Sequence, residues 1–370
     1  INAVTVGGPG FVAVGTALKT TGCGGMPTCP HDAAVWTSPD GLNWSRVPHD
    51  PEVFGGEPWG TEEEAMGGLD GIRVMEDVTA GGPGLVAVGL RFDEKGFPGL
   101  HGAVWTSEDG TTWTVVPRDD LDFCHVPDAN CGVWMRSVTT GGPGLVAVGS
   151  DGWGGAVWTS PDGFVWTRVP HDPEVFAGGA SWESHVELGN VTNAGPLLIA
   201  TGFDDGYASS ALWTSRDGTT WSRAEVEDAR YINGVTEGGP GFVAVGGYED
   251  EPTGCHEGSS GECYAAVWTS TDGVDWTQVP HDTVLFGGGD DKQMMHAVTR
   301  VGSDLVAVGT KVWVSPDGIT WTVAYDDPQI VGAEQNGMYD IAIGSNLVVA
   351  TGPRAYPDDG TAVWVATPAQ

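Results

Sequence analysis

One seven-residue pattern, Ser-x-Asp-Gly-x-x-Trp, occurs six times along the chain and constrains its fold more than any other feature. Each copy follows a strand-like run that ends in a tryptophan two residues before the serine, so each predicts the turn of a β-hairpin. The serine hydroxyl and the aspartate carboxylate can bond the amides of the turn, and the glycine tolerates a left-handed backbone. The copies lie at residues 38–44, 107–113, 160–166, 215–221, 270–276 and 315–321.

This pattern resembles the Asp-box, or bacterial neuraminidase repeat, of the sialidase-like and sortilin-like β-propellers. The usual form in that family is Ser-x-Asp-x-Gly-x-x-Trp, whereas here the glycine directly follows the aspartate, as in Asp40-Gly41. The resemblance implies an all-β propeller in which the boxes are structural. We therefore carry over no catalytic role to the aspartates of the six turns.

Seven further hairpins, each of the type seen at residues 3–15, precede strands that end near a tryptophan. Four strands per repeat predict a seven-bladed β-propeller of antiparallel blades, because stacked blades cover the apolar faces that one sheet leaves open. We expect a single domain spanning residues 1–370. The predicted blades lie approximately at 1–50, 72–118, 133–171, 186–226, 231–281, 294–325 and 337–370.

The seventh blade lacks an evident outer strand, because no turn pattern and no further tryptophan follow the strand at residues 362–365. Three explanations stay open: the blade has three strands, residues outside this sequence supply the fourth, or a neighbouring molecule donates it. An open strand edge invites pairing with another chain. The last explanation would make the protein the subunit of an extracellular polymer or filament.

The formal charge of -35, from 50 acidic residues against 15 Lys plus Arg, excludes several classes of partner. Such a field repels nucleic acid phosphates and anionic membrane surfaces. No apolar run approaches the length of about 20 residues that spans a membrane. We predict no nucleic acid partner and no membrane span, and we interpret the chain as the mature form of a secreted or cell-surface protein.

The six cysteines form three close pairs in the sequence. This spacing predicts local disulfides and hence an extracellular protein, with zinc as the weaker alternative, since only His125 and His256 stand beside cysteines. Acidic loops such as Asp290-Asp291 could hold calcium, although no EF-hand spacing is present. We predict no cofactor, with calcium possible. The pairs are Cys23 and Cys29, Cys124 and Cys131, and Cys255 and Cys263.

Candidate ligand-binding residues come from two alignments of the repeats. The first takes the position two residues before the first Val or Ile of each innermost strand, which in a propeller approaches the mouth of the central channel. It holds Asn2, Glu76, Arg136, Gly189, Asn233, His296 and Tyr339, with Asp77, Asn190 and Asp340 beside them. The second takes the tryptophans that belong to no strand pattern, which are Trp59, Trp134, Trp153 and Trp182. Both sets have a structural alternative, namely strand-end hydrogen bonding and loop packing.

A Val-Pro-His-Asp phrase recurs at residues 47–50, 169–172 and 279–282. We expect it to be structural, with the aspartate closing a turn and a following phenylalanine (Phe54, Phe176 or Phe286) tucked inward.

The sequence favours a non-enzymatic binding or structural module whose loop-rich face binds a neutral or cationic ligand, a glycan or a protein. The Phe-Arg-Ile-Pro motif of sialidases is absent, arginines are scarce, and the negative field opposes an anionic sugar. The alternatives are the polymer subunit and a glycoside hydrolase or sialidase-like enzyme, because fold does not determine function. We assign no catalytic residue.

Overall fold

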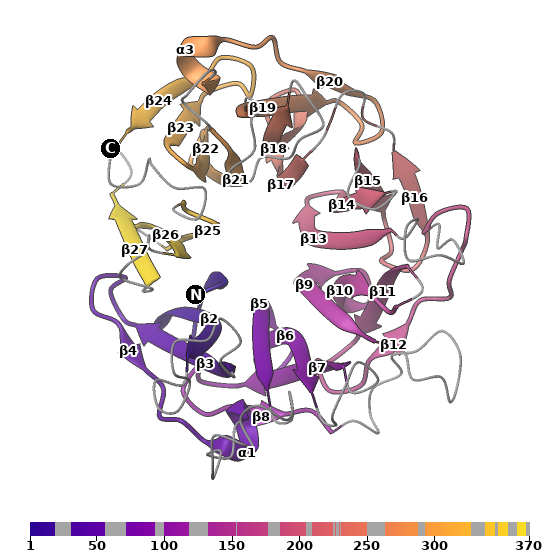
Figure 1. The fold of residues 1–370 in the computed structure, drawn as a ribbon, viewed down its shortest axis with the longest axis vertical. Coiled ribbons are helices and arrows are strands. Elements are labelled where there is room, and N and C mark those ends of the chain that lie inside the picture. Colours follow the sequence, from indigo (N-terminus) through magenta and orange to yellow (C-terminus); the bar gives the residue numbers. More distant parts are fainter. Residues whose placement is uncertain are drawn as a thin grey trace, which may run out of the picture. The chain divides into compact units, whose positions relative to one another are not determined.

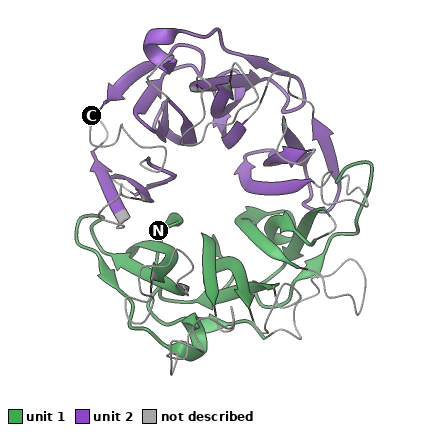
Figure 2. Ribbon diagram, in the orientation of Figure 1, with its two compact units in different colours: residues 1–178 green, residues 179–370 purple. Residues whose placement is uncertain are grey.

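The structure, a computed structural model, is built from repeated antiparallel sheets. It describes residues 1–18, 31–55, 72–92, 100–117, 132–152, 154–176, 186–204, 209–224, 226, 229, 231–249, 263–287, 293–326, 337–344, 347–353 and 361–367. Contacts divide the chain into two compact units, residues 1–178 and residues 179–370 (Figure 2). The fold class is the predicted one, an all-β seven-bladed β-propeller. The grouping of all blades in a single domain stays a prediction.

Unit 1 holds three four-stranded sheets, each formed by strands consecutive in sequence (Figure 1). The strands are β1 (Ala3–Gly7), β2 (Gly10–Leu18), β3 (His31–Ser38), β4 (Ser45–Arg46); β5 (Arg73–Gly81), β6 (Gly84–Phe92), β7 (Leu100–Ser107), β8 (Thr114–Val115); and β9 (Trp134–Gly141), β10 (Gly144–Ser150), β11 (Gly155–Ser160), β12 (Thr167–Arg168). The innermost strand β5 lies beside both β1 and β9.

Unit 2 holds three four-stranded sheets and one three-stranded sheet. The strands are β13 (Glu187–Ala194), β14 (Leu197–Asp204), β15 (Ser209–Ser215), β16 (Trp221–Ala224); β17 (Tyr231–Gly238), β18 (Gly241–Glu249), β19 (Cys263–Ser270), β20 (Trp276–Gln278); β21 (Met295–Val301), β22 (Asp304–Gly309), β23 (Val312–Ser315), β24 (Thr322–Tyr325); and β25 (Asp340–Ile343), β26 (Val348–Pro353), β27 (Thr361–Ala366). The innermost strand β17 lies beside β13 and β21, and β21 also lies beside β25.

The repeated turns join the third and fourth strands of six sheets and share one hydrogen-bond network. In the first, Ser38 Oγ donates to Asp40 Oδ1 at 3.1 Å, and that oxygen accepts the amides of Leu42 and Asn43 at 2.9 and 2.8 Å. Trp44 Nε1 then donates to Gly41 O at 2.9 Å. The other five turns repeat these bonds. The six glycines have φ between 70° and 86°, as the turn prediction requires.

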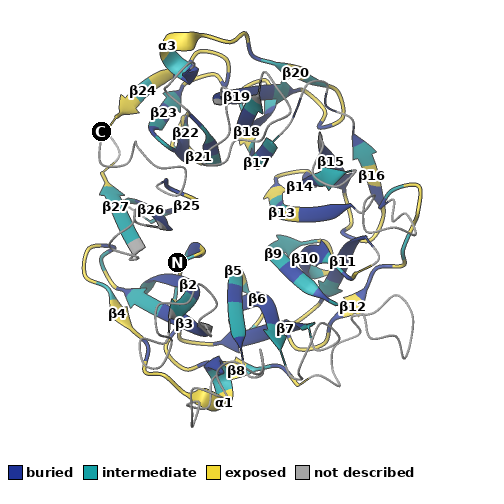
Figure 3. Ribbon diagram, in the orientation of Figure 1, coloured by how far each residue is buried: buried dark blue, intermediate teal, exposed yellow. Residues whose placement is uncertain are grey.

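The apolar core lies between successive sheets rather than inside one. One cluster joins Val12 and Val35 of the first sheet to Met75 and Trp105 of the second, all nearly inaccessible to solvent. Clusters of the same kind join the second and third sheets, the fourth and fifth, the fifth and sixth, and the sixth and seventh. Figure 3 shows the middle strands buried and the outer strands and turns exposed. Each blade therefore depends on its neighbours for burial.

Each Val-Pro-His-Asp sequence is followed by a short segment with a buried phenylalanine. In the first and third copies this segment is a one-turn helix that contacts the next sheet. Asp50 caps the helix α1 (Pro51–Phe54) by accepting the amide of Glu52, and the third-strand indole of Trp105 donates Nε1 to Val53 O at 2.8 Å. The helix α3 (Thr283–Phe286) repeats the arrangement, with Trp313 Nε1 donating to Leu285 O. The phenylalanines at 54, 176 and 286 are buried. The predicted roles of the aspartates, which close the turns, and of the phenylalanines, which are buried, are confirmed.

The seventh sheet has three strands in the described part of the chain, where β27 pairs only with β26. This confirms the predicted lack of an outer strand within those residues. An apolar groove of about 620 Å³, lined by Val306, Val312, Met338 and Trp364 among others, lies between the sixth and seventh sheets.

Acid should remove part of the stability that the repeated turns provide. Backbone hydrogen bonds, first that of Thr112, hold the pKa of Asp109 at about 2, below its ordinary 3.8. We expect Asp109→Asn to lower the thermal midpoint by about 2–4 °C near neutral pH, because charged acceptors form stronger hydrogen bonds. A lowered pKa stabilises above the unfolded value, so the difference should shrink as the pH falls through about 4 and disappear below about 2. The exposed Glu108→Gln is the control, and an equal difference at both ends of this pH range would contradict the assignment.

Truncation of the buried Phe54 should lower the free energy of unfolding far more than truncation of the exposed Phe164. Phe54 is 3% exposed in the core between the first two sheets, whereas Phe164 is 45% exposed at a turn. We expect Phe54→Ala to lower the free energy of unfolding by about 3–5 kcal/mol through lost burial and a cavity. Phe164→Ala should stay within about 0.5 kcal/mol of the parent. Urea unfolding measures both, and equal losses would show that α1 does not anchor the sheet pair.

Candidate functional site

Five of the seven candidate residues of the first alignment sit at β-bulges on the innermost strands. In five sheets the register between the first and second strands shifts by one residue, and the unpaired residue is the candidate in each case. A bulge turns a side chain away from the regular alternation of a strand. The five bulged residues are Glu76, Arg136, Gly189, Asn233 and His296.

A glycine on the second strand permits each bulge. A Cβ atom built on Gly89 or Gly149 would overlap the carbonyl oxygen of Val74 or Trp134 on the bulged strand. Gly202, Gly246 and Gly309 face carbonyl groups in the same way. In four of the five sheets this glycine ends a Val-Ala-Val-Gly segment, and in the fourth sheet it ends Ile-Ala-Thr-Gly. The missing side chain allows the close approach. This was the sequence signal for the bulges, and sequence reasoning missed it.

Asparagines among the candidates join neighbouring sheets. Asn2 Nδ2 donates to Met75 O at 2.9 Å, and Asn233 Nδ2 donates to Met295 O at 2.8 Å. Asn190 Nδ2 donates to Asn233 O at 3.4 Å. These amides are engaged with the backbone of the next sheet, so the structural alternative describes them well.

Asp77 serves the same purpose in unit 1. Its carboxylate accepts Ser137 Oγ at 2.7 Å and the amides of Val138 and Val78 at 2.8 and 2.7 Å. Burial raises its pKa, against the lowering effect of these three bonds. The carboxylate is therefore committed to joining β5 and β9. Asp340 makes the equivalent local bond to the amide of Ile341.

Glu76, Trp134 and Arg136 form one cluster, which we call the acid–indole–guanidinium cluster. Trp134 Nε1 donates to Glu76 Oε1 at 3.0 Å, and the guanidinium carbon of Arg136 lies 3.5 Å from the centre of the indole. All three residues are half-buried at the entry ends of β5 and β9. The indole of Trp134 takes part in both the hydrogen bond and the cation–π contact. It therefore holds the carboxyl group of Glu76 and the guanidinium of Arg136 next to the same ring.

His296 and Tyr339 form a stacked pair in unit 2. Their ring centres are 4.2 Å apart and the planes are inclined by 16°. Burial lowers the pKa of His296 to about 4, and it raises the pKa of Tyr339, whose residue is 37% exposed. The imidazole is therefore neutral at physiological pH, and the outward phenol offers a face and a hydroxyl to a ligand.

The remaining sequence candidates contribute less. Gly189 supplies no side chain, and Trp59, Trp153 and Trp182 lie outside the described residues. The predicted disulfides also lie there, because five cysteines and the side chain of Cys263 are not described. In the described part of the chain, His, Cys, Asp and Glu residues form no group of three that could hold a metal ion. Calcium binding stays a prediction.

Comparisons with protein families and with curated proteins find no match for this chain. Solved structures of similar fold include a glycosyl hydrolase from Bacteroides ovatus, at 12% identity over 71% of this chain and 88% of that one, with a TM-score of 0.35. The Hadza microbial sialidase Hz136 shares 15% identity over 92% and 74%, with a TM-score of 0.44. A thermostable family-43 glycoside hydrolase shares 13% over 62% and 88%, with a TM-score of 0.33. Such low values assign no role to any residue of this chain.

The comparisons contradict the expectation of a non-enzymatic binding or structural module, because these proteins of similar fold are glycoside hydrolases and a sialidase. The sequence arguments behind that expectation concerned mainly sialidases. The missing motif and the scarce arginines argue only against the sialidase pattern, whereas other glycoside hydrolases need carboxyl groups rather than several arginines. Among the described helices, none is long and apolar enough to cross a membrane.

Loss of the stack should change the ionisation of His296. We expect Tyr339→Ala to raise the pKa of His296 from about 4 toward its ordinary 6.5, because water then reaches the imidazole. Histidine ring resonances followed by NMR across this pH range measure the shift, with Tyr325→Ala as the control at an exposed tyrosine of β24. An unchanged titration of His296 would show that other groups bury it.

The same lowered pKa makes His296 a source of acid sensitivity. The unfolded chain takes up the proton first, so the stability that the neutral imidazole provides is present above about 6.5 and is lost as the pH falls toward 4.

Proposed function

We propose that the protein hydrolyses glycosidic bonds and that the acid–indole–guanidinium cluster is part of its active site. The observation that carries the proposal is the hydrogen bond from Trp134 Nε1 to Glu76 Oε1 on a half-buried carboxyl group. A carboxyl group held by an indole N–H keeps a defined orientation. Orientation of this kind is what proton transfer to a leaving oxygen requires.

Glu76 is the carboxyl group to which we assign the acid–base step. Glycoside hydrolases generally use two carboxyl groups, one that protonates the glycosidic oxygen and one that acts as base or nucleophile. The adjacent Asp77 does not supply the second, because three hydrogen bonds engage its carboxylate within the sheets. Arg136, stacked on the same indole, donates hydrogen bonds to sugar hydroxyls.

The substrate class follows from charge. The formal charge of -35 repels anionic sugars, so a neutral glycan is the better substrate. We further propose that the turns are of the Asp-box type and that the protein acts outside the cell. The six repeated turns and the three cysteine pairs support these two proposals.

The test is hydrolysis of a panel of neutral chromogenic glycosides and oligosaccharides. We expect turnover by the parent protein and a loss of about 10²–10⁴-fold in kcat for Glu76→Gln, which keeps the size of the side chain but removes acid–base capacity. The matched control is Glu174→Gln, an exposed glutamate in the same unit. A parent protein inactive on the whole panel, or a fully active Glu76→Gln, would refute the proposal.

A further inference from the structure

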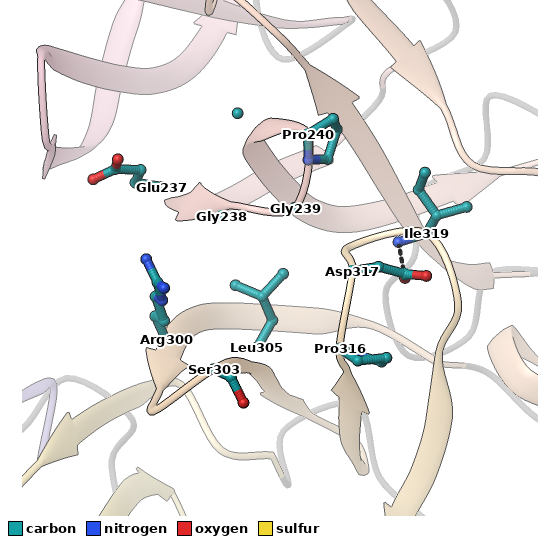
Figure 4. A pocket seen from close by; sticks show the side chains of 11 residues that line it. Glu237, Gly238, Gly239, Pro240, Arg300, Ser303, Leu305, Pro316, Asp317 and Ile319 are labelled. Atoms are coloured by element: carbon teal, nitrogen blue, oxygen red, sulfur yellow. Dashed lines mark hydrogen bonds between the residues drawn. The ribbon is translucent and has the colours of Figure 1, made fainter.

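A polar pocket lies at the ends of β17 and β21 that are opposite their bulges. It has a volume of about 610 Å³ and is formed by the β17–β18 hairpin, the β21–β22 hairpin and the repeated turn before β24, all in unit 2 (Figure 4). Its polar residues include Glu237, Arg300 and Ser303. Asn233 is the third residue of β17 and Glu237 the last but one, so the pocket is separate from the bulge position on the same strand.

Glu237 and Arg300 place opposite charges on one side of this pocket (Figure 4). They come from neighbouring innermost strands, β17 and β21, yet within the described part of the chain they form no ion pair with each other. Both charged side chains therefore line the pocket without being paired to each other. The equivalent positions in the other five sheets are uncharged: Val6, Ala80, Thr140, Asn193 and Ile343.

The surrounding backbone holds both groups in place. A Cβ on Gly195 of the preceding sheet would overlap the carboxylate of Glu237, so glycine at that position lets the acid lie against the backbone. Arg300 Nε donates to Gly302 O at 3.2 Å, which leaves its two terminal amino groups to point elsewhere. Ser303 Oγ donates to Asp304 and keeps its lone pairs as acceptors.

Apolar groups complete the lining. Pro240, Pro316 and the 53% exposed Ile319 line the side of the pocket away from Glu237 and Arg300 (Figure 4). Asp317 adds little, because its carboxylate is engaged by the amides of Ile319 and Thr320 within the turn. The pocket thus combines a carboxylate, a guanidinium and a hydroxyl with C–H surface.

We propose that this pocket binds a neutral sugar residue of a glycan chain. Adjacent sugar hydroxyls can donate to Glu237 and accept from Arg300 at the same time, and the C–H face of the ring packs against proline and isoleucine. An anionic ligand is disfavoured by the net charge of the protein. The pocket belongs to unit 2 and shares no residue with the acid–indole–guanidinium cluster of unit 1, so it binds sugar whether or not that cluster cleaves it. Its function is to hold a polymeric glycan on the protein.

The experiment uses the full chain with Glu76→Gln, so that hydrolysis does not consume the probe. The probes are cellohexaose, xylohexaose, maltohexaose and arabinohexaose, with binding measured by calorimetry and by amide NMR shifts. We expect at least one probe to bind and to shift the amides of Gly239, Gly241 and Ser303. Glu237→Gln and Arg300→Gln, each added separately, should weaken binding at least about 10-fold.

The matched control is Arg216→Gln, an exposed arginine in the repeated turn of the fourth sheet, which should leave the affinity unchanged. Thermal midpoints equal to that of the parent would show that the exposed substitutions keep the fold. Absence of binding by all four probes, or binding that shifts no pocket amide, would overturn the proposal. Either result leaves the hydrolysis test untouched, because that test reports on Glu76 alone.

Discussion

Each sheet of this protein has two apolar faces and cannot bury both by itself. The cores lie between sheets, where valines of one blade meet the buried third-strand tryptophan of the next. The repeated turns take part in the same contact, because Gly8 and Gly239 of the first hairpins approach the backbone of Asp109 and Asp317 in the turn of the following sheet. Close packing at these points leaves no room for a larger residue, which explains why the glycines recur.

The same packing creates the places where chemistry can occur. Five innermost strands bulge opposite a glycine, and four of the bulges direct a side chain out of the sheet. Asn233 at one bulge, and Asn2 at the equivalent position of the first sheet, join neighbouring sheets. Glu76, Arg136 and Tyr339 are the ones whose groups combine partial exposure with a fixed orientation. The β-bulges therefore serve both the packing of the sheets and the placement of the candidate site residues.

Residues that recur in every repeat and residues that differ from their equivalents have different roles in this protein. The turn aspartates have similar surroundings and a uniformly lowered pKa, which suits a structural role. Glu237 and Arg300 break the pattern of uncharged residues at their position, and they do so in adjacent sheets. A repeat that needs no charge there for folding leaves those positions available for a ligand.

The sequence by itself determined the number of sheets, their order and the turn geometry, because these depend on contacts within a few residues of Ser, Asp, Gly and Trp. It also identified Glu76, Arg136 and His296 as equivalent positions, since repeats can be aligned without coordinates. Only the tertiary structure decided how these side chains are used. Trp134 forms a hydrogen bond with Glu76, which is 58 residues away in the sequence. The ring of Tyr339 stacks on His296 from another sheet. Asp77 accepts a hydrogen bond from Ser137 of a neighbouring strand. Such contacts depend on how far one sheet is displaced against the next, and no local pattern encodes that distance.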